Sequence, residues 1–421
     1  MNITTKISYR IKKSWKLLGP GLITGASDDD PSGIATYTQA GAKLGLNTLW
    51  TALITFPLMA SIQEMCARIG VVTCQGLTGV LKAHYPKPIL YLMMIFSFPA
   101  IVMNIGADIE GMGAVAHLLL PAVPIFAFEI LFTFMILLAV ILWPYHKLSG
   151  VLKWLCLVLF LYLVIPFVVK VNWGNVARHT FIPTVHLDKD FFEMLVAILG
   201  TTISPYLFFW QTTMEAEDIA NSRRKIVINK QFMDKMQKDV YLGMFFSNLV
   251  MFFIILTAGV VLYDAGIRKI DTVDQAAKAL EPLAGKVSYV LFAIGVIGTG
   301  FLAIPVLGGS LSYIVAETFN WRLGLEKKFQ QAPAFYLTLI VSLLAGLCMD
   351  FLNISPIQAL IYTAILYGLT APVMIAIVLH ICNSPKIMGE SVNGRWSNIF
   401  GFLALLLMTA SAVALIWFQF K

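Results

Sequence analysis

Long apolar runs recur along the whole chain, and no polar stretch between them is long enough to form a soluble domain. Each run is close to or above the length of about 20 residues that an α-helix needs to cross a bilayer. They predict an all-α integral membrane protein with about eleven transmembrane helices and a single polytopic transport domain over residues 1–421. The predicted spans are 17–44, 47–72, 88–115, 125–143, 149–170, 190–216, 239–264, 284–317, 333–352, 355–381 and 397–419.

The first span is interrupted by three consecutive acids in TGASDDDPSGIATYTQAGA, residues 24–42. An ionisable side chain at the centre of a membrane costs about 2.5–3.5 kcal/mol on insertion scales, so Asp28, Asp29 and Asp30 must face something polar. Asp30 followed by Pro31 is typical of an N-cap and the first residue of a helix. The alternative is a plain loop between two helices, but each half would be too short to cross a bilayer alone. We therefore expect a helix that is broken at mid-membrane.

A second span is interrupted in the same way in AILGTTISPYLFFWQTTMEAED, residues 197–218, which contains Thr201, Thr202, Ser204 and Pro205. Two broken helices in corresponding positions of two halves indicate a transporter with an inverted repeat and with its substrate bound between the breaks. We expect two five-helix repeats followed by an extra helix. Their expected boundaries are 17–170, 190–381 and 397–419.

The two breaks offer only oxygen atoms as ligands. The first carries the three carboxylates and the Ser32 hydroxyl, and the second carries three hydroxyls and the carbonyls that Pro205 releases. Oxygen ligands suit hard cations, Mg²⁺ first, with Ca²⁺ and Mn²⁺ as further candidates. Because Mg²⁺ loses its water reluctantly, its site needs spare room, which Ser32 and Gly33 provide. The metal is expected as the transported substrate, and no cofactor is expected.

Only 13% of the residues are charged and the mean hydropathy is +0.80, whereas about 25% are charged in an average soluble domain. Lys and Arg concentrate in the loops of one side, which predicts a cytoplasmic N-terminus. The net charge of +7 then reflects topology and contact with anionic lipid, and nucleic-acid binding is not expected. The basic first residues lack a cleavage site, so we expect no removable signal peptide. The five cysteines form no CxxC pair, which argues against a zinc site or a disulfide framework.

Three stretches of the chain are the most distinctive: GPGLITGASDDDPSGIATYTQAGA (19–42), QEMCARIGVVTCQGLTGVL (63–81) and LFAIGVIGTG (291–300). They resemble the first, second and eighth spans of the NRAMP divalent-metal transporters, and the similarity covers nearly the whole chain. The resemblance implies a leucine-transporter-like fold with a 5+5 inverted repeat, in which helices 1 and 6 are unwound at mid-membrane.

The sequence departs from the family pattern at the ligands. The family's Asp-Pro-Gly-Asn is matched by Asp30 and Pro31, but Ser32 and Gly33 follow. In the family's Ala-x-x-Met-Pro-His the soft Met has become Ser204, and the His has become Tyr206. Replacing a thioether by a hydroxyl removes the preference for softer metals. This pattern resembles the NRAMP-related magnesium transporters, which implies a wider site for a partly hydrated Mg²⁺, with Mn²⁺ also carried.

These arguments together give a set of candidate residues. We expect an extended outward cavity in which Asp29 and Asp30 hold the ion largely through water. The candidate metal ligands are Asp29, Asp30, Ser32, Gly33, Thr201, Thr202 and Ser204, and the candidates along the ion pathway are Asp28, Tyr206, Asp108 and Glu110.

Proton coupling in the wider family involves the sixth-span His, acids in the third span and arginines in the ninth. Here Tyr206 stands at the His position. Glu110 fits the family's Glu, but Ala107 precedes it and Asp108 is turned to another face. The ninth span, within 330–350, contains no Arg. The resemblance therefore predicts uncoupled or weakly coupled uptake that the membrane potential drives.

Other functions remain as alternatives. The first is a proton-coupled Mn²⁺/Fe²⁺ symporter of the ordinary NRAMP type. The second is an organic-solute symporter of the same fold, although Asp29 and Asp30 would repel a substrate carboxylate. A membrane enzyme would need a nucleophile with its base or a motif such as HExxH, and neither is present; a channel fits two broken helices less well. We expect a bacterial cytoplasmic membrane protein whose partners are the metal cation and the bilayer, with no obligate protein partner evident.

Overall fold

The computed structural model describes residues 20–143, 160–221, 228–352 and 354–420, together with Lys147 and Gly150. All regular structure in these residues is helical. The first half contains α2 (Pro20–Asp28), α3 (Pro31–Leu44), α4 (Leu49–Thr73), α5 (Leu77–His84), α6 (Lys87–Leu119), α7 (Ile125–Leu142), α9 (Leu161–Val168) and α10 (Trp173–Phe181). The second half contains α11 (Lys189–Thr202), α12 (Pro205–Asn221), α13 (Lys230–Ala258), α16 (Ser288–Phe319), α17 (Pro333–Leu347), α18 (Pro356–Cys382) and α20 (Arg395–Gln419). Short helical turns connect them: η2 (Gly259–Tyr263), α14 (Val273–Ala277), η3 (Lys278–Leu280), α15 (Glu281–Ala284), η4 (Gly285–Val287), η5 (Phe329–Gln331), η6 (Cys348–Leu352) and α19 (Pro385–Met388).

Both predicted helix breaks are confirmed. The first lies between α2 and α3, where Asp30 is the N-cap with extended backbone angles (φ −72°, ψ 172°). The second lies between Thr202, the last residue of α11, and Pro205, the first residue of α12. Pro31 and Pro205 both occupy the first position of a helix, where the missing N–H has no helical partner to lose. The same local chemistry therefore starts a new helix in each half.

Among the described residues, eight helical segments are long and apolar enough to cross a membrane, if α11 and α12 are taken together. The difference from the predicted number has local causes. The separate pieces α2 and α3 have only 9 and 14 residues, so the first predicted span exists only as the pair. α4 is 25 residues long but carries a buried pair of charges, Glu64 and Arg68. The first part of the predicted fifth span, residue 149 and residues 151–159, lies outside the described residues.

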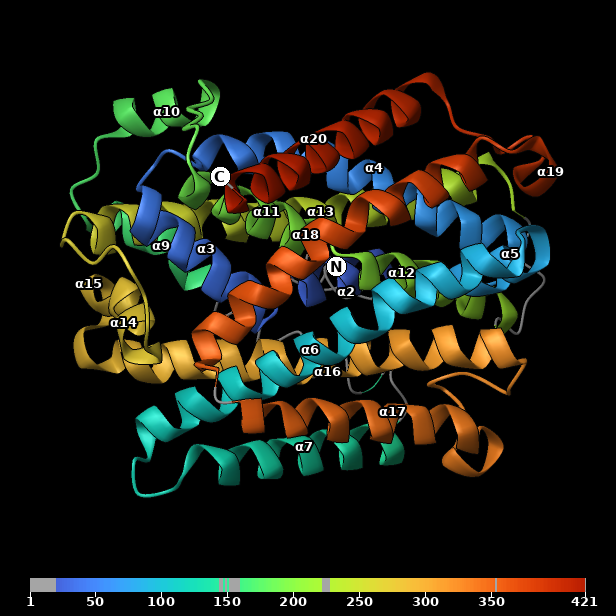
Figure 1. The fold of residues 1–421 in the computed structure, drawn as a ribbon, viewed down its shortest axis with the longest axis horizontal. Coiled ribbons are helices and arrows are strands. Elements are labelled where there is room, and N and C mark those ends of the chain that lie inside the picture. Colours follow the sequence, from blue (N-terminus) through green and yellow to red (C-terminus); the bar gives the residue numbers. More distant parts are fainter. Residues whose placement is uncertain are drawn as a thin grey trace, which may run out of the picture.

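The long helices form two groups around the short broken ones (Figure 1). On one side α7 and α17 pack against each other and against α6, which also contacts α16. On the other side α13 packs against α4, and α18 packs against α11 and α20. α2, α3 and α12 lie between the two groups. The broken helices are therefore enclosed by protein, as non-helical backbone at membrane depth requires.

The outer helices expose large apolar side chains. Ile130, Leu131 and Phe134 on α7 and Leu406 and Trp417 on α20 are each 47% to 68% exposed. Apolar surface of this extent is unfavourable in water and is normal for helices that face lipid. The apolar surface of the outer helices and the hydropathy of the chain therefore both indicate an integral membrane protein.

Glycines hold the broken helices close to their neighbours. A Cβ atom on Gly25 of α2 would overlap the backbone of Gly243 in α13, and one on Gly243 would overlap the carbonyl group of Gly21. At the second break, a Cβ on Gly200 of α11 would overlap the backbone of α18 at Gly368. Such small residues let helix backbones approach closely inside a membrane, and here they fix the helix ends that carry the breaks.

Gly243→Ala tests this close contact. The added methyl group has no space, and overpacking of this kind costs about 1–3 kcal/mol. We expect a lower melting temperature for the purified variant in detergent. Gly394→Ala is the control, because no described atom lies within 4 Å of a Cβ at that position. Equal melting temperatures for Gly243→Ala and the wild-type protein would contradict the packing described here.

Candidate functional site

The two breaks meet inside the protein. A Cβ atom on Gly33 would lie 3.3 Å from the carbonyl oxygen of Asp28 and 3.4 Å from Thr201 Oγ1. The phenol of Tyr206, at the start of α12, donates a hydrogen bond of 3.0 Å to the carbonyl of Ser27, at the end of α2. The acids of the first break and the hydroxyls of the second therefore surround one site.

Asp30 is held by a donor on each of its carboxylate oxygens. Oδ1 accepts a hydrogen bond of 2.7 Å from the backbone N–H of Gly33, which is the N-cap bond of α3. Oδ2 accepts a hydrogen bond of 3.0 Å from the side-chain amide of Asn104 on α6. Asp30 is only 2% exposed, so these bonds replace the water that a carboxylate would otherwise bind.

Asp28 and Asp29 face a different helix. Ser247 Oγ on α13 donates to Asp28 Oδ2 at 2.7 Å and lies 3.4 Å from Asp29 Oδ1. Oδ1 of Asp28 is buried and has no hydrogen-bond partner among the described residues. One hydroxyl thus serves two neighbouring carboxylates, and the pair has acceptor capacity left over.

Three of the predicted hydroxyl ligands use their protons on backbone carbonyls. Ser32 Oγ donates to Leu360 O of α18 at 2.8 Å. Thr202 and Ser204 donate within α11 and its end. The oxygen lone pairs of these three hydroxyls remain available to a cation. The fourth predicted hydroxyl, Thr201 Oγ1, lies directly beside Gly33. The structure therefore brings Asp30, Gly33 and Thr201 together at the junction, whereas Asp29 lies toward Ser247 of α13. Ser32, Thr202 and Ser204 have an additional role in holding the helix ends.

The two third-span acids lie in different surroundings. Asp108 is completely buried. Its carboxylate lies close enough to the backbone N–H of Ser32 and to Asp30 to interact with both. Glu110 interacts instead with Asp350 in η6. Asp108 is thus part of the surroundings of the first break, and Glu110 lies toward the outer helices.

The sequence analysis did not identify several polar groups of the site. Asn104, Ser247 and Thr363 contact the break residues from the unbroken helices α6, α13 and α18. Glu129 of α7 was also missed; it is only 1% exposed and lies outside the junction, where it interacts with Glu110 and Asp350. A usable signal was present, because each is a polar side chain within an apolar span.

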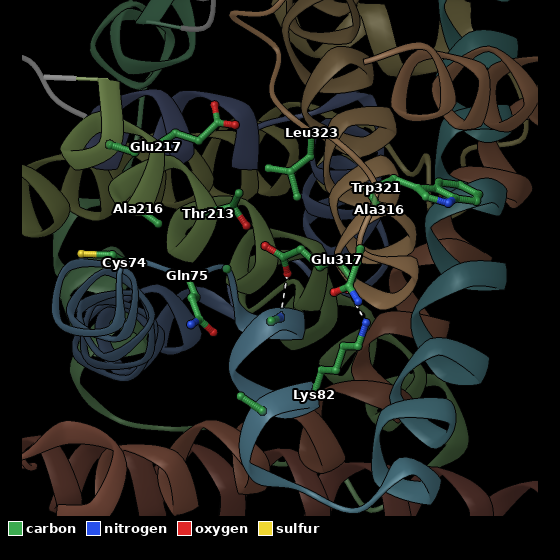
Figure 2. Close-up of a pocket in the computed structure, with 15 residues that line it drawn as sticks. Cys74, Gln75, Lys82, Thr213, Ala216, Glu217, Ala316, Glu317, Trp321 and Leu323 are labelled. Atoms are coloured by element: carbon green, nitrogen blue, oxygen red, sulfur yellow. Dashed lines mark hydrogen bonds between the residues drawn. The ribbon is translucent and has the colours of Figure 1, made fainter. Parts of the chain in front are cut away.

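A separate cavity of about 640 Å³ opens between the end of α4, α5, α12 and α16 (Figure 2). Thr213, Glu217, Glu317 and Lys82 are among its lining residues. Glu317 accepts a hydrogen bond of 2.8 Å from the N–H of Gly79, and Lys82 Nζ donates to the backbone at the end of α16. None of the predicted site residues lines this cavity. The junction of the breaks, whose three acids are 1% to 4% exposed, is closed off from it.

Comparison with protein families gives a match over residues 21–418 to the family described as natural resistance-associated macrophage protein-like. The chain is 23% identical to the divalent metal cation transporter MntH of Klebsiella pneumoniae (strain 342), over 97% of this chain and 95% of that protein. It is 22% identical to MntH of Bacillus subtilis (strain 168), over 96% of this chain and 92% of that protein.

Solved structures share the fold. The manganese transporter of Eremococcus coleocola, in complex with an aromatic bis-isothiourea substituted compound, superposes with a TM-score of 0.73 at 18% identity, covering 96% of this chain and 86% of that one. MhsT in complex with L-phenylalanine superposes with a TM-score of 0.63 at 11% identity, covering 94% and 98%. The predicted fold class is confirmed by these likenesses.

Ser247→Ala tests the pairing of the acids. Without the hydroxyl, Asp28 and Asp29 lose their shared donor, and an unsatisfied buried polar group costs about 1–3 kcal/mol. We expect a lower melting temperature without metal and a larger rise when Mg²⁺ is added, because a cation then compensates more unpaired charge. Ser310→Ala is the matched control, since the buried Ser310 hydroxyl bonds only within its own helix. The pairing would be refuted by equal metal-induced rises in Ser247→Ala and the wild-type protein.

Proposed function

Because the chain belongs to the Nramp family, we propose that it transports divalent metal cations, with Mg²⁺ as the main cargo and Mn²⁺ also carried. As a member of this family it is a membrane transporter and not an enzyme, and the metal is its substrate. The chain spans nearly the full length of its relatives, so the proposal concerns a whole transport unit. The candidate ligands and the choice of Mg²⁺ are the parts that go beyond the family.

The oxygen-only junction of the two breaks carries the proposal. Asp30 and Thr201 present oxygen atoms there, Asp29 is the adjacent carboxylate, and Ser204 stands where the resembling family has a thioether. Oxygen ligands favour hard cations, and they accept Mn²⁺ as well. Gly33 stands where the resembling family has an Asn ligand, so one direct ligand is absent and a water on the ion can take its place. These features support a site that holds a partly hydrated Mg²⁺.

A methionine sulfur lies near the site and could take the place of the thioether ligand that Ser204 replaces. Met251 Sδ of α13 is 3.6 Å from Thr202 Oγ1 and 4.0 Å from Thr55 Oγ1. Two hydroxyl groups of the protein therefore already contact this thioether. Its contacts support a packing role, and the junction keeps its oxygen character.

We further propose that uptake is driven by the membrane potential without proton coupling. Tyr206 replaces the family's His, and its hydroxyl proton is engaged by the carbonyl of Ser27. A divalent cation gains about 4.6 kcal/mol from a potential of 100 mV, which is sufficient to drive accumulation without a second ion. A proton-coupled Mn²⁺/Fe²⁺ symporter is the second candidate, and the completely buried carboxylate of Asp108 close to Asp30 is the observation that favours it.

The topology fits a bacterial cytoplasmic membrane with the N-terminus inside. In this orientation the cavity of Figure 2 lies at the cytoplasmic end of α4, α12 and α16 and would receive the ion after release. Repeats 17–170 and 190–381 would then rearrange around the junction, as in other inverted-repeat transporters. No other protein is required for this cycle.

Uptake into proteoliposomes that contain only the purified chain tests the function. Under an imposed inside-negative potential we expect Mg²⁺ to enter without acidification of the lumen. Asp30→Ala is expected to abolish entry because the site loses a principal carboxylate, and Asp271→Ala, which removes an exposed acid, should leave entry unchanged. Mn²⁺ entry that excludes Mg²⁺ and carries protons would support the second candidate instead.

Gly33→Asn tests whether the absent side-chain ligand sets the cargo. The amide would restore the ligand of the resembling family and compete with a water on the ion, so a hydrated ion should be held less well. We expect the ratio of Mg²⁺ to Mn²⁺ uptake to fall about tenfold, equivalent to 1.4 kcal/mol. Gly33→Ala controls for the added Cβ alone, which would make contacts of 3.3–3.4 Å, and should change the ratio less. An unchanged ratio in Gly33→Asn would show that a side-chain ligand at this position does not select the ion.

A further inference from the structure

Asn104 is an amide in the middle of α6, and it is completely buried. Its Nδ2 group donates a hydrogen bond of 3.0 Å to Asp30 Oδ2. Its Oδ1 atom accepts one of 3.3 Å from Thr363 Oγ1 of α18. An ionised carboxylate can only accept hydrogen bonds, so the NH₂ end of the amide must face Asp30. Both ends of the amide are therefore fixed by partners on two other helices.

Thr363 belongs to a closed group of polar contacts. Its Oγ1 has one proton, which is shared between Asn104 Oδ1 at 3.3 Å and Leu360 O at 2.8 Å. Oγ1 also lies 3.2 Å from Ser32 Oγ, which bonds to the same Leu360 carbonyl. Ser32 precedes Gly33, whose N–H holds the other oxygen of Asp30. The contacts thus run from Asp30 through Asn104 and α18 back to the start of α3. This arrangement fixes the plane of the Asp30 carboxylate.

The hydrogen bonds from Gly33 and Asn104 also weaken the ability of Asp30 to bind a cation directly. With a donor on each oxygen, less of its negative charge and fewer of its lone pairs are available for direct metal coordination. A carboxylate that accepts a hydrogen bond from a metal-bound water needs less free negative charge than one that replaces the water and binds the metal directly. Mg²⁺ keeps several waters in most protein sites, so an Asp30 held in this way suits Mg²⁺ better than an ion that must be stripped of water.

We propose that Asn104 is a positioning residue that sets the ion selectivity of this transporter. It restrains Asp30 to act as an acceptor for the water of a hydrated ion, and Thr363 keeps the amide in the required orientation. The inference rests on the proposed function of Mg²⁺ transport. Without the Asn104 amide, Asp30 gains a free oxygen for direct coordination, and the preference shifts toward Mn²⁺, which gives up water more readily.

Uptake from an equimolar mixture of Mg²⁺ and Mn²⁺ into proteoliposomes tests the proposal. Asn104→Leu keeps the approximate volume and removes the amide, and we expect the Mg²⁺ to Mn²⁺ ratio to fall about tenfold, the scale of one hydrogen bond to a charged group. Thr363→Val frees the amide to rotate and should lower the ratio about threefold, a smaller loss because only the supporting bond is removed. Thr363→Ser keeps the hydroxyl and should restore the wild-type ratio.

Thr370→Val is the matched control in the same helix. The Thr370 hydroxyl bonds only to carbonyls of α18, so this variant should keep the wild-type ratio. A purely structural role for Asn104 would reduce uptake of both ions equally, and an unchanged ratio in Asn104→Leu overturns the proposal. If Asn104→Leu does not fold, the Thr363→Val and Thr363→Ser pair decides, with equal ratios overturning it.

The two proposals fail in different ways. If the wild-type protein takes up Mn²⁺ but no Mg²⁺, both the proposed function and the role of Asn104 are wrong. If the wild-type protein takes up Mg²⁺ and the variants show the same Mg²⁺ to Mn²⁺ ratio, only the role of Asn104 is wrong.

Discussion

Three adjacent carboxylates removed from water would each carry a desolvation penalty of several kcal/mol unless polar groups or a cation surround them. Much of the fold can be understood from this requirement. The helix is broken so that backbone N–H groups can reach Asp30. Unbroken helices on two sides contribute Asn104 and Ser247, and close glycine contacts hold α2 against α13. Oδ1 of Asp28 has no hydrogen-bond partner among the described residues, so acceptor capacity remains beside the proposed ion.

The acids are divided between two environments, and this division gives the site its chemistry. Asp30 is bound to the start of α3 and to α6, whereas Asp28 and Asp29 share one hydroxyl from α13. Asp30 is held on both of its oxygens, so part of its charge is already balanced by donors. Asp28 and Asp29 retain capacity to accept further hydrogen bonds or a cation. Such a combination favours an ion that keeps its water and is held by hydrogen bonds as much as by direct ligands.

The sequence was sufficient to predict the broken helices and to identify the acids. Asp30 followed by Pro31, and Pro205 after Ser204, are local signals that act within a few residues and do not depend on packing. The partners of the acids could not be predicted in the same way, because Asn104, Ser247 and Thr363 are far away in the chain and only helix packing brings them to the breaks. The hydrogen bonds that the hydroxyls of Ser32, Thr202 and Ser204 donate to backbone carbonyls could not be predicted either, because they depend on side-chain rotation. Polar residues inside apolar spans were the signal that deserved more weight.

If the ion is held largely through water, as proposed, the water that stays on the bound ion can be counted. Mn²⁺ bound to the wild-type protein in D₂O can be examined by pulsed electron paramagnetic resonance, which detects deuterons on metal-bound water. We expect several waters to remain on the ion, as is usual for Mg²⁺ sites, and the bound signal to be lost in Asp30→Ala. An ion ligated by protein atoms with a single water or none would contradict the proposal.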